Sequence, residues 1–158
     1  MILLLLLSIL LGSFGLLTAL DRWVVRGKLN AGLLGRISLA LLFCFTGLGH
    51  FLMPGEMAQM LPPWVPARLA IIYVTGVLEI AGAIGLLVPR FSRLAGICLL
   101  AFLIAAFPAN IYAALNHVQM GGHESGPIYL LVRGPFQLLL IAWTWWFAAR
   151  IVNLQRAD

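Results

Sequence analysis

The chain has 158 residues, of which 63% are hydrophobic and only 9% are charged, and its mean hydropathy is +1.05. A water-soluble domain of this length would carry a far more charged surface, so the composition predicts a membrane protein. The basic residues behind the net charge of +5 lie in short segments between apolar runs, which argues against a nucleic-acid-binding patch.

Five apolar runs follow one another along the chain, at residues 2–20, 37–53, 70–88, 94–114 and 128–149. Each is long enough, as a helix, to cross a hydrocarbon core of about 30 Å. The runs are continuous, whereas the strands of a membrane barrel alternate apolar and polar residues. The sequence therefore predicts an all-α integral membrane protein with five transmembrane helices.

The first run has some features of a signal peptide and lacks others. No Lys or Arg precedes Arg22, and Thr18-Ala19-Leu20 is a poor cleavage site because it does not match the usual pattern of small residues two apart. We expect a retained N-terminal helix with a basic cytoplasmic linker in residues 1–35, a membrane domain in 36–150 and a cytoplasmic tail in 151–158.

Basic residues predict the orientation of the helices. If all five runs span, eight basic residues share one side, in residues 22–36, 90–93 and 150–156, and the other side holds only Arg68 and Arg133. Because cytoplasmic segments are enriched in Lys and Arg, we expect the N-terminus outside and the C-terminus cytoplasmic, in the cell inner (plasma) membrane. The proline-rich segment 54–68 and the loop 116–127 then lie on the outer side.

Glu79 is the most informative residue, because a carboxyl group inside a transmembrane run is costly and usually functional. The helix rise places Glu79 and Gln137 about 14 Å below the outer surface. Arg133 lies about 8 Å deep by the same count, and Asn110 and His50 about 5 to 6 Å. Four helices thus place polar side chains in the outer half of the membrane, which predicts one internal cluster.

Two alternatives remain open for this cluster. In one, Glu79 is neutral in apolar surroundings, and in the other it is charged beside Arg133. The cluster could bind a ligand, a proton or a partner, or it could only lock the helices through hydrogen bonds. Tyr112 is a further candidate to bond into the cluster.

Other polar and aromatic residues have plainer interpretations. Cys44 and Cys98 form no C-x-x-C pattern, and we interpret both as small buried hydrophobes. His117, His123 and Glu124 match no metal-site spacing, and we interpret them as solvated loop residues. The three tryptophans of residues 143–146 are typical of an aromatic belt at the membrane interface.

The sequence from residue 36 to residue 150 resembles the DoxX-like family of small bacterial membrane proteins. The matching segments are FTGLGHF at residues 45–51, LPPWVP at 61–66, VTGVLEI at 74–80, FPANIY at 107–112 and RGPFQ at 133–137. The resemblance implies a four-helix membrane bundle, to which the first run adds a helix. It also implies an association with membrane redox complexes, while most members have no established activity.

We therefore expect a redox- or quinone-associated accessory protein, and not an enzyme by itself, that binds a lipophilic small molecule in an outer polar cavity. The expected site residues are Glu79, Arg133, His50, Asn110, Gln137 and Tyr112. We expect no metal and no resident cofactor, with a quinone as the candidate ligand. Two alternatives are a structural or assembly subunit of a membrane complex and a small proton-coupled transporter.

Overall fold

The computed structural model describes residues 2–150, which form a bundle of helices with no strand among them. The first long helix, Ile2–Val25, contains two π-helical stretches. The elements in order are α1 (Ile2–Leu7), η1 (Ser8–Gly12), α2 (Ser13–Leu20), η2 (Asp21–Val25), α3 (Ala31–Leu52), α4 (Pro54–Gln59), α5 (Arg68–Leu87), α6 (Ser92–Leu115), η3 (His123–Tyr129), α7 (Leu130–Thr144) and η4 (Trp145–Ala149).

Five of the described helical segments are long and apolar enough to cross a membrane: Ile2–Val25, Ala31–Leu52, Arg68–Leu87, Ser92–Leu115 and His123–Ala149. This confirms the prediction of an all-helical, multi-pass membrane protein. The helix limits differ from those of the apolar runs by up to six residues, and only the start at Ile2 and the end at Ala149 coincide. The tail predicted at residues 151–158 lies outside the described residues.

The start of α3 shows why a helix and its apolar run can begin at different residues. The Asn30 side chain accepts a hydrogen bond from the Gly32 amide at 2.7 Å, so α3 begins six residues before its apolar run. Such side-chain caps satisfy the free amides of a first turn, and they follow residue type and not hydropathy.

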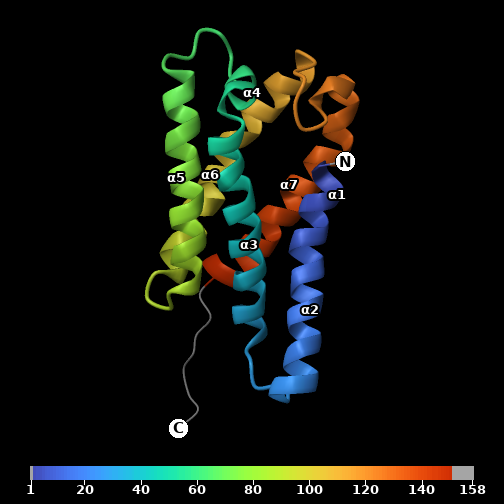
Figure 1. Cartoon of the computed structure of the whole chain (residues 1–158), viewed down its shortest axis with the longest axis vertical. Coiled ribbons are helices and arrows are strands. Elements are labelled where there is room, and N and C mark those ends of the chain that lie inside the picture. The colour runs from blue at the N-terminus through green and yellow to red at the C-terminus, as the bar shows by residue number, and fades with distance from the viewer. Residues whose placement is uncertain (1, 151–158) are drawn as a thin grey trace.

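Successive long helices run in opposite directions, as Figure 1 shows. The linker after η2, the turn between α5 and α6, and the end of η4 lie together at one end of the bundle, which we call the basic end. It carries most of the basic residues: Arg22, Arg26, Lys28, Arg36, Arg90, Arg93 and Arg150. The opposite end, which we call the α4 end, carries the short helix α4 and the η3 segment.

Small residues bring the helices close together at the basic end. A methyl group built on Gly82 would lie 2.7 Å from Leu99, and one on Gly85 would lie 2.8 Å from Ala95, so α5 and α6 touch there. A methyl group on Gly96 would lie 2.7 Å from Ala148, which brings η4 against α6. Small residues permit this approach of helix backbones in membranes.

Toward the α4 end, close glycine contacts join α3 to α5. A methyl group on Gly76 would lie 2.6 Å from the His50 Cβ atom, and one on Gly47 would lie 2.8 Å from Ile80. Each of these glycines also lies against the carbonyl oxygen of the other. The α3–α5 pair is therefore closely packed on the side that carries His50 and Glu79.

We expect Gly76→Leu to destabilise the protein by about 1–3 kcal/mol, because the larger side chain would force α3 and α5 apart. Gly12→Leu is the matched control, since nothing lies within 4 Å of a Cβ atom at that position. Thermal unfolding in detergent measures both. Equal stability of the two variants would contradict the close α3–α5 packing.

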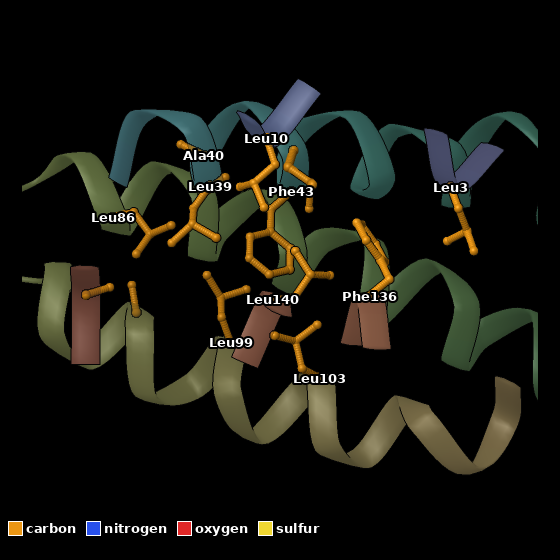
Figure 2. Close-up of a cluster of buried hydrophobic side chains, with 14 residues drawn as sticks. Leu3, Leu10, Leu39, Ala40, Phe43, Leu86, Leu99, Leu103, Phe136 and Leu140 are labelled. Atoms are coloured by element: carbon orange, nitrogen blue, oxygen red, sulfur yellow. The ribbon is translucent and has the colours of Figure 1, made fainter. Parts of the chain in front are cut away.

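The apolar core lies between the helices and includes residues of the first helix (Figure 2). Leu10 has no exposed surface, and it packs in one cluster with Leu39 and Phe43 of α3 and Leu140 of α7. The first helix is thus an integral part of the packed bundle.

Three of the plainer interpretations are corrected by the structure. Cys98 is exposed on α6, at a surface available to lipid, and is not a buried hydrophobe. Trp143 packs inward, with its ring centroid 5.1 Å from that of Phe14, while its two neighbours at residues 145 and 146 are exposed. His123 is only 3% exposed, because its ring packs edge-on against Tyr129.

Candidate functional site

A cavity of about 430 Å³ lies between the helices in the half of the bundle toward the α4 end. Ligand pockets for small molecules generally enclose about 300–1,000 Å³. The walls are mostly apolar, and Met57, Met60 and Leu61 contribute to them from α4 and the segment that follows. Its polar lining residues are Thr46, His50, Thr75, Glu79, Asn110, Arg133 and Gln137.

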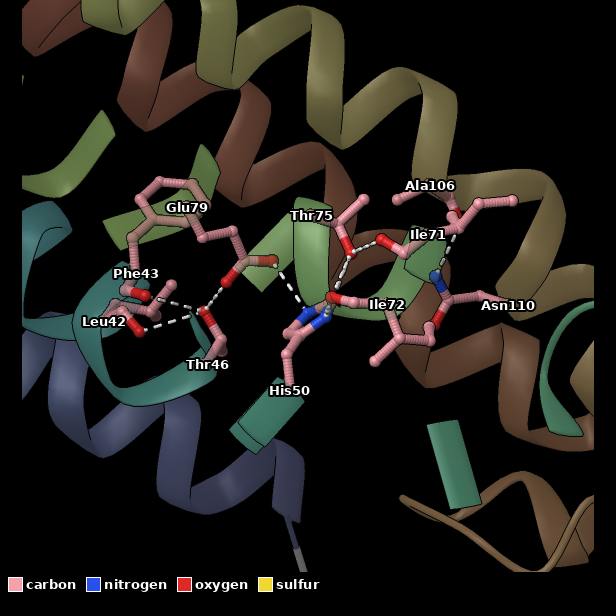
Figure 3. Close-up of polar contacts among 10 residues, drawn as sticks. All are labelled: Leu42, Phe43, Thr46, His50, Ile71, Ile72, Thr75, Glu79, Ala106 and Asn110. Carbon is pink, nitrogen blue, oxygen red and sulfur yellow. Dashed lines mark hydrogen bonds and ion pairs between the residues drawn. The ribbon is translucent and has the colours of Figure 1, made fainter. Parts of the chain in front are cut away.

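The first polar wall comes from α3 and α5 and is centred on Glu79, which is 4% exposed (Figure 3). Its Oε1 atom lies 3.4 Å from Nε2 of His50. Its Oε2 atom is hydrogen-bonded to the Thr46 hydroxyl. Both carboxyl oxygens therefore have a partner on α3, the helix that the glycine contacts bring close.

The contacts of Nδ1, the second ring nitrogen of His50, determine how many protons His50 and Glu79 share. Nδ1 of His50 lies 2.9 Å from the Ile72 carbonyl oxygen, which can only accept, and 3.0 Å from the Thr75 hydroxyl, which can accept while it donates to the same carbonyl oxygen, so Nδ1 carries a hydrogen. Nε2 and Glu79 Oε1 would then both be acceptors unless one proton lies between them. The pair therefore holds one proton, and its net charge is zero whether the proton resides on His50 or on Glu79.

Thr46 accommodates both arrangements of this proton. Its hydroxyl donates to Oε2 of Glu79 in each of them, because the shared proton lies at Nε2 of His50 or at Oε1 of Glu79 and leaves Oε2 free to accept. Either state leaves the buried carboxyl group satisfied. The first wall can thus carry the proton on either residue without losing hydrogen bonds.

The second polar wall comes from α6 and α7. Asn110 donates to the Ala106 carbonyl oxygen at 3.0 Å, which leaves its Oδ1 atom to accept from Nε of Arg133 at 3.1 Å. One turn further along α7, Gln137 donates to the Leu103 carbonyl oxygen at 2.6 Å. Because a carbonyl requires a donor, these bonds also assign the nitrogen and oxygen of each amide.

Two buried polar atoms on this wall have no hydrogen-bond partner among residues 2–150: Nη1 of Arg133 and Oε1 of Gln137. One is a donor and the other is an acceptor. Buried polar groups are nearly always paired, so unpaired groups beside a cavity indicate a missing polar partner. The second wall therefore offers free hydrogen-bonding capacity to an occupant.

Five of the six residues predicted for the site line this one cavity: Glu79, Arg133, His50, Asn110 and Gln137. Tyr112 is half-buried on α6 and does not line it. The alternative in which Glu79 pairs with Arg133 is wrong, because the ion pair of Glu79 is with His50 and Arg133 bonds to Asn110. The cluster is thus two separate walls and not one network.

Three further residues line the cavity and were not predicted from the sequence: Thr46, Met57 and Met60. Thr46 lies four residues before His50, so both share one face of α3, and this spacing is a signal that could have found it. The two methionines could not have been predicted in this way. An apolar segment beside the membrane is as typical of an interfacial anchor as of a cavity lining.

Metal binding has no support in the described part of the chain. Among residues 2–150, no three His, Cys, Asp or Glu side chains are grouped so that they could hold a metal ion. His117 and Glu124 are exposed in the segment near the α4 end, while His123 donates from Nδ1 to the Met120 carbonyl oxygen at 2.7 Å.

The comparisons with known proteins identify a family whose function is unknown. The family model described as "Domain of unknown function (DUF8561)" matches residues 39–148. This range covers α5, α6 and α7 with most of α3, and hence all the polar residues of the cavity. The comparisons with curated proteins and with solved structures gave no match.

Proposed function

The chain belongs to the DUF8561 family, whose function is unknown, and we propose from its cavity that it is a membrane protein that binds a lipophilic small molecule. The observation that carries the proposal is the pair of unpartnered buried atoms, Nη1 of Arg133 and Oε1 of Gln137, beside a largely apolar cavity. Apolar walls with a few placed polar groups are the usual composition of a small-molecule site.

The alternative of a purely structural lock has less support. The hydrogen bonds that line the cavity stay within each wall: Thr46 and His50 bond across α3 and α5, and Arg133 and Gln137 bond across α6 and α7. Each wall stabilises its own helix pair, but these bonds do not hold the two pairs together across the cavity. A lock would need to connect the walls, whereas a ligand site needs the space between them.

The redox-accessory role rests on the resemblance to the DoxX-like family. A quinone suits the cavity chemically, because its ring is apolar and its carbonyl oxygen can accept from Arg133. We place the basic end in the cytoplasm and the cavity toward the outer side of a bacterial inner membrane, since Lys and Arg are enriched on the cytoplasmic side. A membrane-dissolved ligand fits a site at that depth.

Native mass spectrometry of the purified protein, combined with extraction of its lipids, tests the proposal. We expect a bound small molecule in the wild type and at least a tenfold smaller bound fraction in Gln137→Leu, because the unpartnered acceptor Oε1 is removed from the cavity. Gln59→Leu is the matched control, since Gln59 is exposed on α4 and does not line the cavity.

An empty bundle in the wild type and in both variants would overturn the proposal. If Gln137→Leu were then merely less stable, the polar groups would serve to hold α6 against α7. The search would turn to protein partners, as expected for an assembly subunit.

A further inference from the structure

Arg133 is a half-buried cation with a buried Nη1 atom and without an anionic partner. The one ion pair in residues 2–150 joins His50 to Glu79, and the hydrogen-bond partner of Arg133 Nε is the neutral amide of Asn110. Nη1 of the same guanidinium has no partner, and the Phe136 ring lies 5.6 Å from its central carbon. Arg is always protonated in proteins, so this charge does not disappear on burial.

Glu79 does not neutralise Arg133. The proton held between Glu79 and His50 makes that pair neutral overall, and both carboxyl oxygens are already bonded on the first wall. The other nearby side chains of η3 do not supply the charge either: Glu124 is exposed and accepts from the Gly122 amide, and His123 and Tyr129 are not acids of the carboxyl type. The polar lining therefore carries a net charge of about +1.

A buried charge without a counter-ion is costly, and in membranes such charges are paired or mark a ligand site. We infer that the occupant of the cavity is a single-chain amphiphile with a monoanionic carboxylate head, such as a long-chain fatty acid, whose head pairs with Arg133. This inference rests on the proposed function and names the ligand class of the same cavity. The carboxylate accepts a charge-assisted hydrogen bond from Nη1 of the guanidinium group.

The rest of the cavity fits such a molecule. Beyond the two polar walls the lining is apolar, with Leu42, Phe43, Phe102 and Leu140 available to an alkyl chain. A volume of about 430 Å³ suits one chain and not a two-chain phospholipid. The unpartnered Oε1 of Gln137 can accept from a water molecule that bridges to the carboxylate, as bridging waters commonly do in ligand sites.

Binding of palmitate, measured by native mass spectrometry in detergent, tests the inference against two neutral probes, hexadecanol and decyl-ubiquinone. We expect the wild type to bind palmitate at least tenfold more tightly than hexadecanol. Arg133→Met should abolish this preference, while Arg133→Lys should keep it because the charge remains. Arg68→Met is the control, since it removes a positive charge at the same end of the bundle but outside the cavity lining.

Equal affinity of the wild type for palmitate and hexadecanol would overturn the inference, and so would a preference that persists in Arg133→Met. Preferential binding of decyl-ubiquinone would overturn the carboxylate assignment while leaving a lipophilic ligand site in place. Failure of all three probes together with an empty cavity in the wild type would overturn the inference and the proposed function together. Arg133→Lys keeps the test decisive if Arg133→Met does not fold.

Discussion

His50→Phe is expected to destabilise the protein by about 1–3 kcal/mol, the usual cost of leaving a buried polar group without its partner. The reason is the contact between Nε2 of His50 and Oε1 of Glu79 at 3.4 Å, in a site where Glu79 is 4% exposed. Without the imidazole, the Glu79 carboxyl group keeps only the Thr46 hydroxyl as a partner. Thermal unfolding in detergent measures the effect.

A double-mutant cycle separates this interaction from general packing. Glu79→Leu leaves His50 without its carboxyl partner, and in the double variant His50→Phe/Glu79→Leu neither group remains to be satisfied. We expect the double variant to lose less stability than the sum of the two single variants, with a coupling energy of about 0.5–3 kcal/mol. Strictly additive losses would mean that the two residues do not interact, and Glu56→Leu on exposed α4 serves as the control for introducing leucine.

The helices were predictable from the sequence because the cost of free backbone groups in lipid leaves helix as the only structure for a long apolar run. The grouping of His50, Asn110 and Gln137 with Glu79 was predictable for a related reason. A helix has a fixed rise, so sequence position gives depth, and polar side chains at one depth avoid lipid by facing one another. The cavity lining agrees with this expectation.

The partner of each polar residue was not predictable in the same way. By depth alone, Arg133 lies within reach of Glu79. Whether the two residues pair depends on the distance between the α3–α5 pair and the α6–α7 pair. Close glycine contacts hold α3 against α5 at Gly47 and Gly76, and Asn110 holds Arg133 on the other wall. The distance between helices in the membrane plane depends on side-chain packing. The depth of a residue along its helix carries no information about that distance.

The contribution of the first helix was also hidden from the sequence. Its leucines lie on all sides of the run, and its polar residues Ser8, Ser13 and Thr18 are five apart and lie on different faces, so no face of the run is marked as inward. The structure distinguishes them: Leu10 has no exposed surface, Leu6 lines the cavity, and Leu16 is 63% exposed. The family model begins at residue 39, so this helix contributes to the core from outside the matched range.

Leu10→Ala tests that contribution and is expected to destabilise the protein by about 1–3 kcal/mol. Large-to-small substitutions in water-soluble cores cost about 2–5 kcal/mol, the sum of a transfer term and a cavity term. In a membrane the transfer term largely disappears, because lipid tails are as apolar as leucine, and the cavity term remains. Leu16→Ala removes the same atoms at an exposed position, so we expect little change there. Equal losses in the two variants would mean that the first helix is not packed on the core through Leu10.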